Sequence, residues 1–298
     1  MCMTLGEAEL SSTKLYAGEA RRGETYVHVL AYQNKAATQG PNAMVLPLPA
    51  KVMPGPGNVV DARGFRRFLD DIHDATRDWS RVPRSAGLDE LEAAAQVFDV
   101  GSYTVVLASS ARTVRGALER VPASKRPVLN AVALGAFEAL YPGWPLAVCC
   151  WDGTLEAEPL LWWYEPMLPD QLLAPALDAH DGQPPRTDAI VEVDHHVAFG
   201  STLRPTGLEV HYQDDARVDD RRAAPSWIVP YERPAAEEQL PRPVASTALL
   251  PRQVHGTRIQ RAMPNGDFWL PTQKLGGPAV RRAPGAKHGI SVPLDGWV

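Results

Sequence analysis

Cys2 is the residue whose type and position best suit nucleophilic chemistry. A small second residue favours removal of Met1, which would leave Cys2 with a free α-amine. That amine, with an ordinary pKa of about 7.7–8.0, can take the proton of the thiol, so one residue supplies both nucleophile and base. The amide of Asn42 could complete an oxyanion hole. Cys2 and Asn42 together predict a thiol hydrolase or acyltransferase. The alternative is that Cys2 has no role and that Asn42 only stabilises the predicted turn beside it.

A second group has the residue types that bind metal ions. If 190–198 and 207–213 form a hairpin, strand alternation places Asp194 and His196 on one face, and a register that pairs His196 with His211 brings two imidazoles and a carboxylate together. Such ligands suit zinc or another divalent ion, the one cofactor that the sequence predicts. The hairpin therefore has two interpretations. It is a divalent-metal-dependent enzyme or sensor site at Asp194, His196 and His211, or it is an amphipathic hairpin with a solvated polar face.

A third group is aromatic and surrounds two adjacent cysteines, Cys149 and Cys150. Its members could line a ligand pocket or form part of the core, in which case the cysteines behave as small buried hydrophobic residues. The group consists of Trp144, Trp151, Trp162, Trp163 and Tyr164.

The stretch 26–49 is the element around which the body is organised. Residues 26–33 alternate between two largely apolar faces, which predicts a strand that is covered on both sides. Gly40 and Pro41 then predict a turn, and 43–46 is a second short apolar strand. Pro47 and Pro49 cannot donate to a sheet, so this second strand must end there or lie at an edge.

Further strands and helices alternate along the rest of the body. The β-branched run 103–108 predicts a strand, and 146–151 and 160–165 predict a hairpin around Asp152 and Gly153. Apolar residues at helical spacing predict helices over 61–80, 88–97, 109–121 and 127–141. The resulting expectation is an α+β fold: a mixed sheet with several packed helices, followed by an extended Pro-rich C-terminal arm.

Short motifs in residues 1–165 resemble an uncharacterised bacterial family of unknown function. The motifs are Met1-Cys2, Tyr32-Gln33 followed by the run 44–49, the strand 103–107, and 159–164. Members of that family begin with a cysteine after leader removal and carry a YQ…WVLPVP core. Here Met44 stands where the family has tryptophan, and the chain begins without an export leader. The resemblance implies a shared fold for the first 165 residues and no particular activity.

Composition excludes several functional classes. The chain has 298 residues and a net charge of −5, which argues against a nucleic-acid binder with a basic face. No stretch approaches the roughly 18 apolar residues of a membrane span. The N-terminus has no basic region before an apolar one, so it does not read as a secretory signal. Three cysteines cannot form a disulfide framework. These features predict a cytoplasmic protein that binds neither membrane nor nucleic acid.

The C-terminal segment 223–298 differs from the body, 1–222. It holds 11 of the 28 prolines, and its nine basic and five acidic residues give it a net charge of +4, which leaves −9 for the body. Apolar residues such as Trp227, Phe268 and Trp269 recur in it, unlike in a solvated linker. We therefore expect an arm that packs on the body or on a neighbouring subunit. Because this is the most unusual feature, the leading functional prediction is a binding or assembly protein that forms a homo-oligomer or part of a larger protein assembly.

Overall fold

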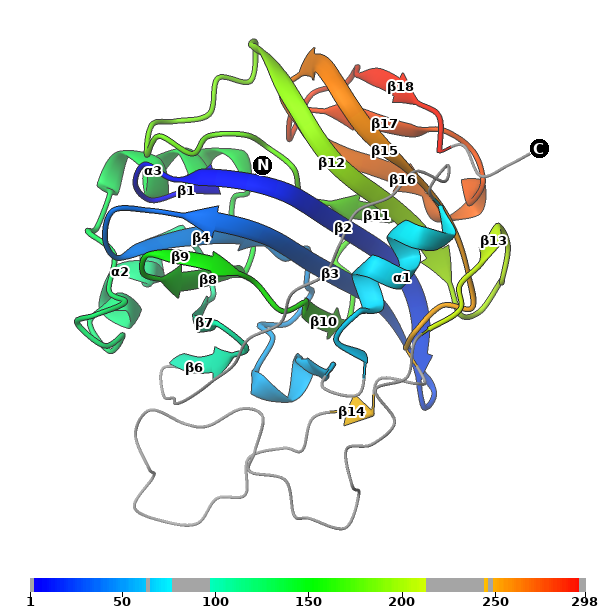
Figure 1. The fold of residues 1–298 in the computed structure, drawn as a ribbon, viewed down its shortest axis with the longest axis horizontal. Coiled ribbons are helices and arrows are strands. Elements are labelled where there is room, and N and C mark those ends of the chain that lie inside the picture. Colours follow the sequence, from blue (N-terminus) through cyan, green and yellow to red (C-terminus); the bar gives the residue numbers. More distant parts are fainter. Residues whose placement is uncertain (1–2, 63–64, 77–96, 213–243, 246–248, 295–298) are drawn as a thin grey trace.

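The protein is built mainly from strands (Figure 1). The computed structural model describes residues 3–62, 65–76, 97–212, 244–245 and 249–294. Eighteen strands and three α-helices lie within these residues. The helices are short, and their bounds are α1 (Phe68–Ala75), α2 (Val114–Leu118) and α3 (Ala131–Leu140). Single turns of 3-10 helix are η1 (Pro56–Asn58), η3 (Ala111–Thr113) and η5 (Thr272–Lys274).

The first sheet has five strands, and all neighbouring pairs in it are antiparallel. In spatial order its strands are β1 (Met3–Thr4), β4 (Asn42–Pro47), β8 (Leu146–Trp151), β7 (Tyr103–Ala108) and β6 (Val97–Val100). Every residue of these five strands is buried. Strands that are covered on both faces read as continuous apolar runs, which is why 103–108 and 146–151 are recognisable in the sequence.

The second sheet has seven strands and contains the longest ones. Along its main path the strands are β10 (Leu160–Tyr164), β3 (Thr25–Ala37), β2 (Glu9–Arg22), β12 (Ile190–Ser201), β15 (Gln253–Pro264) and β13 (Leu208–Glu209), and β9 (Thr154–Glu156) also pairs with β3. β2 and β3 form a hairpin that turns at Gly23, whose φ of 59° suits glycine. β2 and β12 run parallel, while β12 and β15 are antiparallel.

Two smaller sheets complete the fold. The four-stranded sheet contains β11 (Gln171–Ala174), β16 (Asp267–Pro271), β17 (Ala279–Arg282) and β18 (Ile290–Val292), in that order. The two-stranded sheet pairs β5 (Val60–Asp61) with β14 (Val244–Ala245).

Three hydrophobic clusters divide the molecule into layers. The largest cluster draws on strands of all three larger sheets, so these sheets share one interior. A second cluster lies between the opposite face of the five-stranded sheet and α2 and α3. A third lies between the opposite face of the seven-stranded sheet and α1, which Figure 1 shows lying across the long strands. Strand alternation explains the division, because Leu30 and Tyr32 of β3 belong to the shared interior while Val29 and Ala31 face α1.

The predicted α+β fold with several packed helices and an extended arm is wrong, because the protein is β-rich. Of the C-terminal segment, residues 253–294 contribute β15 to β18 instead of an extended arm. Three of its described prolines stand at or next to strand ends, where a missing N–H costs no ladder hydrogen bond. Pro264 and Pro271 end β15 and β16, and Pro278 directly precedes β17. The boundary expected near Ala223 and the helix expected over 88–97 fall outside the described residues, except that Val97 begins β6.

The predicted hairpin of 146–151 and 160–165 is also wrong, although both strands exist. β8 pairs with β4 and β7 in the first sheet, whereas β10 pairs with β3 in the second. The residues between them form β9, which also joins β3. The chain therefore crosses from one sheet to the other at Asp152 and Gly153 instead of folding back on itself.

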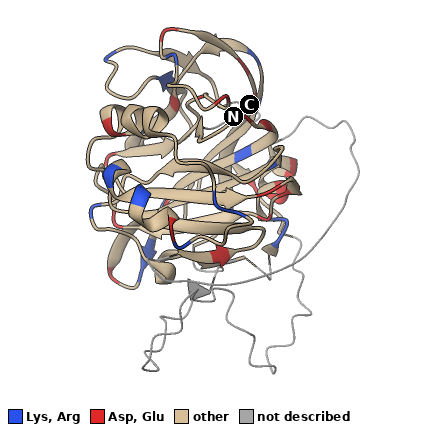
Figure 2. Cartoon of the chain, turned by 90° about the vertical axis from the view of Figure 1, so that its left-hand side faces the viewer, with Lys and Arg blue, Asp and Glu red and all other residues tan. Residues whose placement is uncertain are grey.

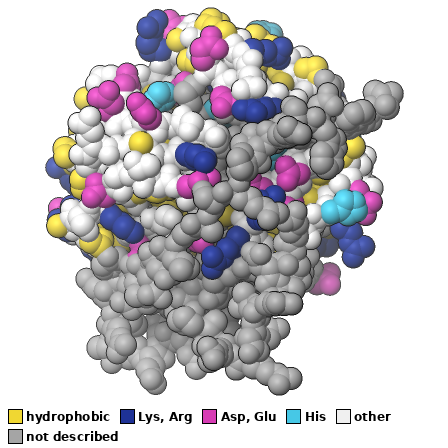
Figure 3. Space-filling model, in the orientation of Figure 1, with side chains coloured by type: hydrophobic (Ala, Val, Ile, Leu, Met, Phe, Trp, Pro, Cys, Tyr) yellow, Lys and Arg dark blue, Asp and Glu magenta, His cyan; other side chains and the backbone are white. Residues whose placement is uncertain are grey.

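Charged side chains of both signs are interspersed over the described surface (Figures 2 and 3). Among the described residues, no helix has the length and apolar character needed to cross a membrane.

Candidate functional site

Cys2 lies outside the described residues, and its proposed partner Asn42 is committed to the backbone. The Asn42 side chain is buried at the start of β4. Its Oδ1 accepts hydrogen bonds from the N–H groups of Gly6 (2.9 Å) and Ala43 (2.8 Å), and its Nδ2 donates to the carbonyl of Glu7 (2.9 Å). The amide thus fastens the segment after β1 to β4, and these contacts occupy the group that an oxyanion hole would need.

The structure separates the three predicted metal ligands. β15 lies between β12 and β13, so His196 stands opposite Arg258, and His211 follows β13 on the far side of β15 as an exposed residue. Asp194 forms an ion pair with Arg258 (3.1 Å). In the described part of the chain, no group of three or more His, Cys, Asp or Glu side chains is arranged to hold a metal ion. The expected hairpin failed because its return strand is not local in sequence.

His196 is instead buried beneath α1. Its ring stacks on that of His73, with centroids 4.5 Å apart, and its Nε2 lies 2.5 Å from Oγ1 of Thr76. Since the Thr76 hydroxyl donates to the carbonyl of Ile72 (2.9 Å), we assign the proton of the shared hydrogen bond to Nε2 of His196. Burial lowers the pKa of His196 well below its ordinary value, and the nearby His73, Lys14 and Arg258 lower it further. The neutral ring therefore holds the last turn of α1 onto β12.

The aromatic group belongs mainly to the core. Trp151, Trp162 and Tyr164 are buried in the interior that the sheets share, and Cys149 and Cys150 are buried in the same sheet as Trp151. Trp163 is partly exposed on the other face of its strand, where Arg22 lies over its ring at 4.3 Å.

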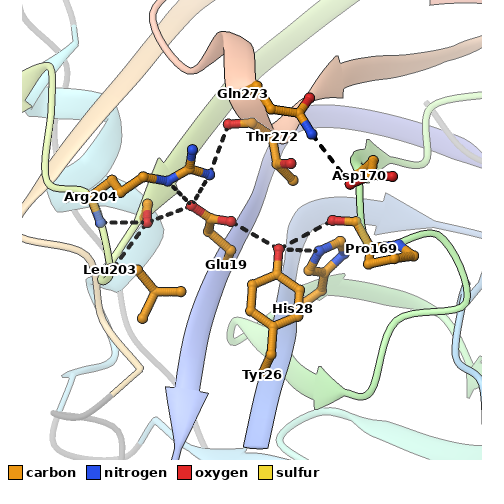
Figure 4. A network of polar contacts seen from close by, with 10 residues as sticks. Glu19, Tyr26, His28, Pro169, Asp170, Leu203, Arg204, Thr272 and Gln273 are labelled. Atoms are coloured by element: carbon orange, nitrogen blue, oxygen red, sulfur yellow. Dashed lines mark hydrogen bonds and ion pairs between the residues drawn. The ribbon is translucent and has the colours of Figure 1, made fainter.

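An extensive polar cluster surrounds Glu19, a buried acidic residue of β2 (Figure 4). One carboxylate oxygen, Oε1, accepts from the hydroxyl of Ser201 (2.9 Å) and from the guanidinium of Arg204 (Nε, 2.9 Å). The other, Oε2, accepts from the hydroxyl of Tyr26 (2.8 Å). The hydroxyl of Tyr26 also lies 3.1 Å from Nε2 of His28.

Adjacent strands bring this cluster together. Glu19 of β2 stands opposite His28 of β3 on one side and opposite Ser201 of β12 on the other. The cluster continues into the four-stranded sheet, because Arg204 donates to the carbonyl of Thr272 in η5 (2.9 Å). It therefore joins three strands of one sheet to a turn of another. In the sequence, the one sign of this cluster is that Glu19 is an acidic residue inside the otherwise largely apolar run 15–20.

The electrostatics of this cluster favour a fixed structural role. Burial lowers the pKa of His28 to about 4, and Glu19 offsets only part of that effect. Burial and the hydrogen bond to Glu19 raise the pKa of Tyr26. Both side chains are consequently neutral at pH 7, and both oxygens of Glu19 are occupied by protein donors. A general acid or base works best with a pKa near the operating pH, a condition that neither His28 nor Tyr26 meets.

A second buried cluster fastens the four-stranded sheet to α3. Asp267 accepts from the N–H groups of Ala176 (2.8 Å) and Leu177 (3.0 Å) and from the hydroxyl of Tyr141 (2.7 Å). The buried guanidinium of Arg281 donates through Nε to the carbonyl of Pro264 (2.7 Å). These contacts satisfy buried hydrogen-bonding groups of the backbone. This cluster therefore has a structural role, like the cluster around Glu19.

The most unusual surface feature lies on α3 and the residues just before it. Val128 and Val132 are 85% and 61% exposed. The exposed residues beside them in the helix are all small, namely Ala131, Gly135 and Ala139. The only charged residue of the helix, Glu138, forms an ion pair with Arg112 (2.8 Å). The outward face of α3 is therefore apolar and without charge.

Comparisons with known proteins give little further guidance. No family model matches the sequence, and no curated protein matches it. Among solved structures, the crystal structure of baculovirus P35 is similar, with 16% sequence identity, coverage of 67% of each chain and a TM-score of 0.42.

Proposed function

We propose that this protein is an assembly protein that acts as a homodimer, with the outward face of α3 as the surface that binds the second copy. The observation that carries the proposal is the pair of exposed valines, Val132 on α3 and Val128 just before it, beside a helix whose only charged residue is Glu138. A helix that covers a sheet normally presents charged or polar residues to water. Contact with a second copy would remove these valines from water.

Gly135 supports a close approach by a partner. It lies in the middle of α3, where glycine costs about 1 kcal/mol relative to alanine. Among the described residues nothing requires the missing side chain, because a Cβ built on Gly135 meets none of their atoms within 4 Å. The backbone of a packed helix from another molecule would explain why the position carries no side chain.

The arrangement of these residues makes the face complementary to itself. Ala131, Gly135 and Ala139 are spaced by four residues, so their small side chains would leave a shallow groove along the helix, and Val132 would stand beside it. In a pair related by a two-fold axis, each Val132 can enter the groove of the other copy. Packing of four-residue ridges into matching grooves gives a helix crossing of about −50°, and a two-fold axis is the commonest symmetry of protein dimers.

The size of the apolar contact sets the expected affinity. Burial of Val128 and Val132 from both copies would contribute on the order of 6 kcal/mol. Association itself costs about 4–15 kcal/mol. The valines alone would offset only the low end of this cost, so the small residues of the same face must also contribute, and we expect a weak dimer that dissociates on dilution.

Sedimentation equilibrium over a wide concentration range tests the proposal. The full chain should shift from monomer to dimer as its concentration rises, and Val132→Glu should remain monomeric because it places a charge in the contact. Val52→Glu is the matched control, since Val52 is also a valine, is 64% exposed and belongs to the segment after β4 instead of α3. A chain that is monomeric at every concentration, or a Val132→Glu variant that dimerises like the parent, would refute the proposal.

A further inference from the structure

Asn130 connects the beginning of α3 to two other segments of the chain. It is the N-cap of the helix, and its Oδ1 accepts hydrogen bonds from the N–H groups of Val132 (3.1 Å) and Ala133 (3.0 Å). Its Nδ2 donates to the carbonyls of Leu5 (3.0 Å) and Gly182 (2.6 Å). The side chain therefore makes all four hydrogen bonds that an amide can make.

The two segments that Asn130 reaches are bonded to each other. The N–H of Thr4 donates to the carbonyl of Ala179 (2.9 Å), and the N–H of Ala8 donates to the carbonyl of His180 (2.8 Å). β1 also pairs with β4, which fixes both segments to the first sheet. Residues 3–8 and 179–182 thus form one N-terminal support on which the beginning of α3 rests.

Asn130 stands between the two valines of the proposed dimer contact. Val128 precedes it by two residues and Val132 follows it by two. The residues of α3 that pack into the core beneath it are Ala133, Leu134 and Phe137. They hold the middle of the helix, whereas Asn130 supplies hydrogen bonds that hold its beginning, where the valines lie.

We propose that Asn130 controls the dimer contact by coupling the beginning of α3 to the N-terminal support. The inference rests on the proposed dimer. While Asn130 donates to Leu5 and Gly182, the two valines keep the positions in which both meet the second copy. A movement of the N-terminal support is transmitted to the dimer contact through this one side chain.

Asn130→Asp separates this coupling from helix capping. Aspartate is favoured at an N-cap and still accepts the hydrogen bonds of the helix, but its carboxylate cannot donate to the two carbonyls. The dissociation constant of the dimer, measured by sedimentation equilibrium on the full chain, should rise about ten-fold or more because two hydrogen bonds are lost. Hydrogen exchange within 133–140 should stay that of the parent.

Asn58→Asp is the matched control for this variant. Asn58 also accepts from a backbone N–H, that of Gly55 (2.9 Å), and donates to a carbonyl, that of Trp163 (2.9 Å), but it lies in η1. It should dimerise like the parent. Unchanged dimerisation of Asn130→Asp, or an equal loss in Asn58→Asp, would overturn the inference and leave the dimer standing, whereas a monomeric parent would refute both proposals.

Gly182 tests the coupling from the side of the N-terminal support. Its φ is 73°, and a Cβ at this position would lie 3.1 Å from Nδ2 of Asn130 and 3.1 Å from the carbonyl oxygen of Leu5. Gly182→Ala should therefore displace Asn130 and weaken the dimer. Gly153→Ala is its control and should dimerise like the parent, since Gly153 has a similar φ of 67° but a Cβ there meets no described atom within 4 Å.

The double variant distinguishes coupling from independent damage. Asn130→Asp combined with Gly182→Ala should weaken the dimer no more than the stronger of the two single variants, because both break the same connection. Losses that multiply in the double variant would show two independent effects and would overturn the inference.

Discussion

Helices α1 and α3 each cover the outer face of one sheet, but their outward faces differ. α1 presents Asp70 and Asp74 to ion pairs with Lys14 (2.7 Å) and Arg67 (3.1 Å). α3 presents valine, alanine and glycine, with Glu138 as its only charged residue. Both helices bury aromatic residues on their inner faces, so both inner faces pack against a sheet in the same way. The outer face of α1 therefore carries paired charges, whereas the outer face of α3 is mainly apolar.

The largest expected change in stability concerns the inner faces of α1 and α3. It tests whether the buried aromatic residues of the two helices contribute equally. Phe68 of α1 and Phe137 of α3 are both fully buried, and Phe68 also packs against the rings of Tyr16 (5.7 Å) and Tyr212 (5.8 Å). Replacement of either phenylalanine by alanine should lower the free energy of unfolding by about 3–5 kcal/mol, as measured by urea denaturation.

Val128→Ala is the control for these two variants. Its side chain is exposed, so at a concentration where the protein is monomeric its free energy of unfolding should stay within about 0.5 kcal/mol of the parent. A loss below about 1 kcal/mol for Phe137→Ala would contradict the packing of α3 and with it the comparison.

Acidification should lower the stability of the whole protein, with a somewhat smaller effect than the loss of either phenylalanine. The pKa of His28 is lowered to about 4, while an unfolded histidine titrates near pH 6.5. Between these values the unfolded state binds the proton and the folded state does not, so stability present above pH 6.5 is lost as the pH falls towards 4. The loss from His28 should be about 3 kcal/mol, as measured by urea denaturation at several pH values.

His196 acts in the same direction, and it lies directly beneath α1. Hydrogen exchange at pH 5 should therefore show loss of protection in α1 before α3, because the buried histidines of the described residues, His28, His195 and His196, all belong to the seven-stranded sheet and not to the sheet beneath α3. His196→Gln should reduce the difference. Equal loss of protection in both helices would show that His196 does not control the docking of α1.

The smallest effect concerns Gly135 alone. Gly135→Ala should raise the free energy of unfolding of the monomer by up to about 1 kcal/mol, because alanine favours the helix and the space is open. Gly143→Ala is a useful contrast, since Gly143 has a φ of 71° and alanine should be destabilising there. A destabilised Gly135→Ala monomer would mean that the position is constrained within the chain itself.

Local patterns in the sequence predicted strands well and their partners poorly. The runs 103–108 and 146–151 are strands with those same bounds, because burial on both faces leaves a continuous apolar signature. Pairing was misjudged wherever it is non-local. β8 and β10 look like a hairpin but belong to different sheets, and the strands that flank His196 come from residues 9–22 and 253–264.

The candidate sites show the same difference between local patterns, which the sequence reveals, and non-local strand pairing, which it does not. Val132 of α3 could not be separated from the buried apolar residues of the helix, because nine of its ten residues are apolar or glycine and periodicity cannot show which face is covered. Glu19 could have been noticed as an acid within the apolar strand 15–20. Its partners Ser201 and Arg204 could not, because they reach it through the parallel pairing of β2 with β12.

The order of strands in the seven-stranded sheet also determines how the chain reaches its final state. Its centre is assembled from β2, β12 and β15, which lie near the beginning, past the middle and near the end of the chain. Such pairings give a high contact order. The chain loses the entropy of closing long loops before the strand contacts stabilise it, so folding is slow. During synthesis, β12 keeps one unpaired edge until residue 264 has left the ribosome. That edge is the place where a nascent chain of this protein is most exposed to aggregation and most in need of a chaperone.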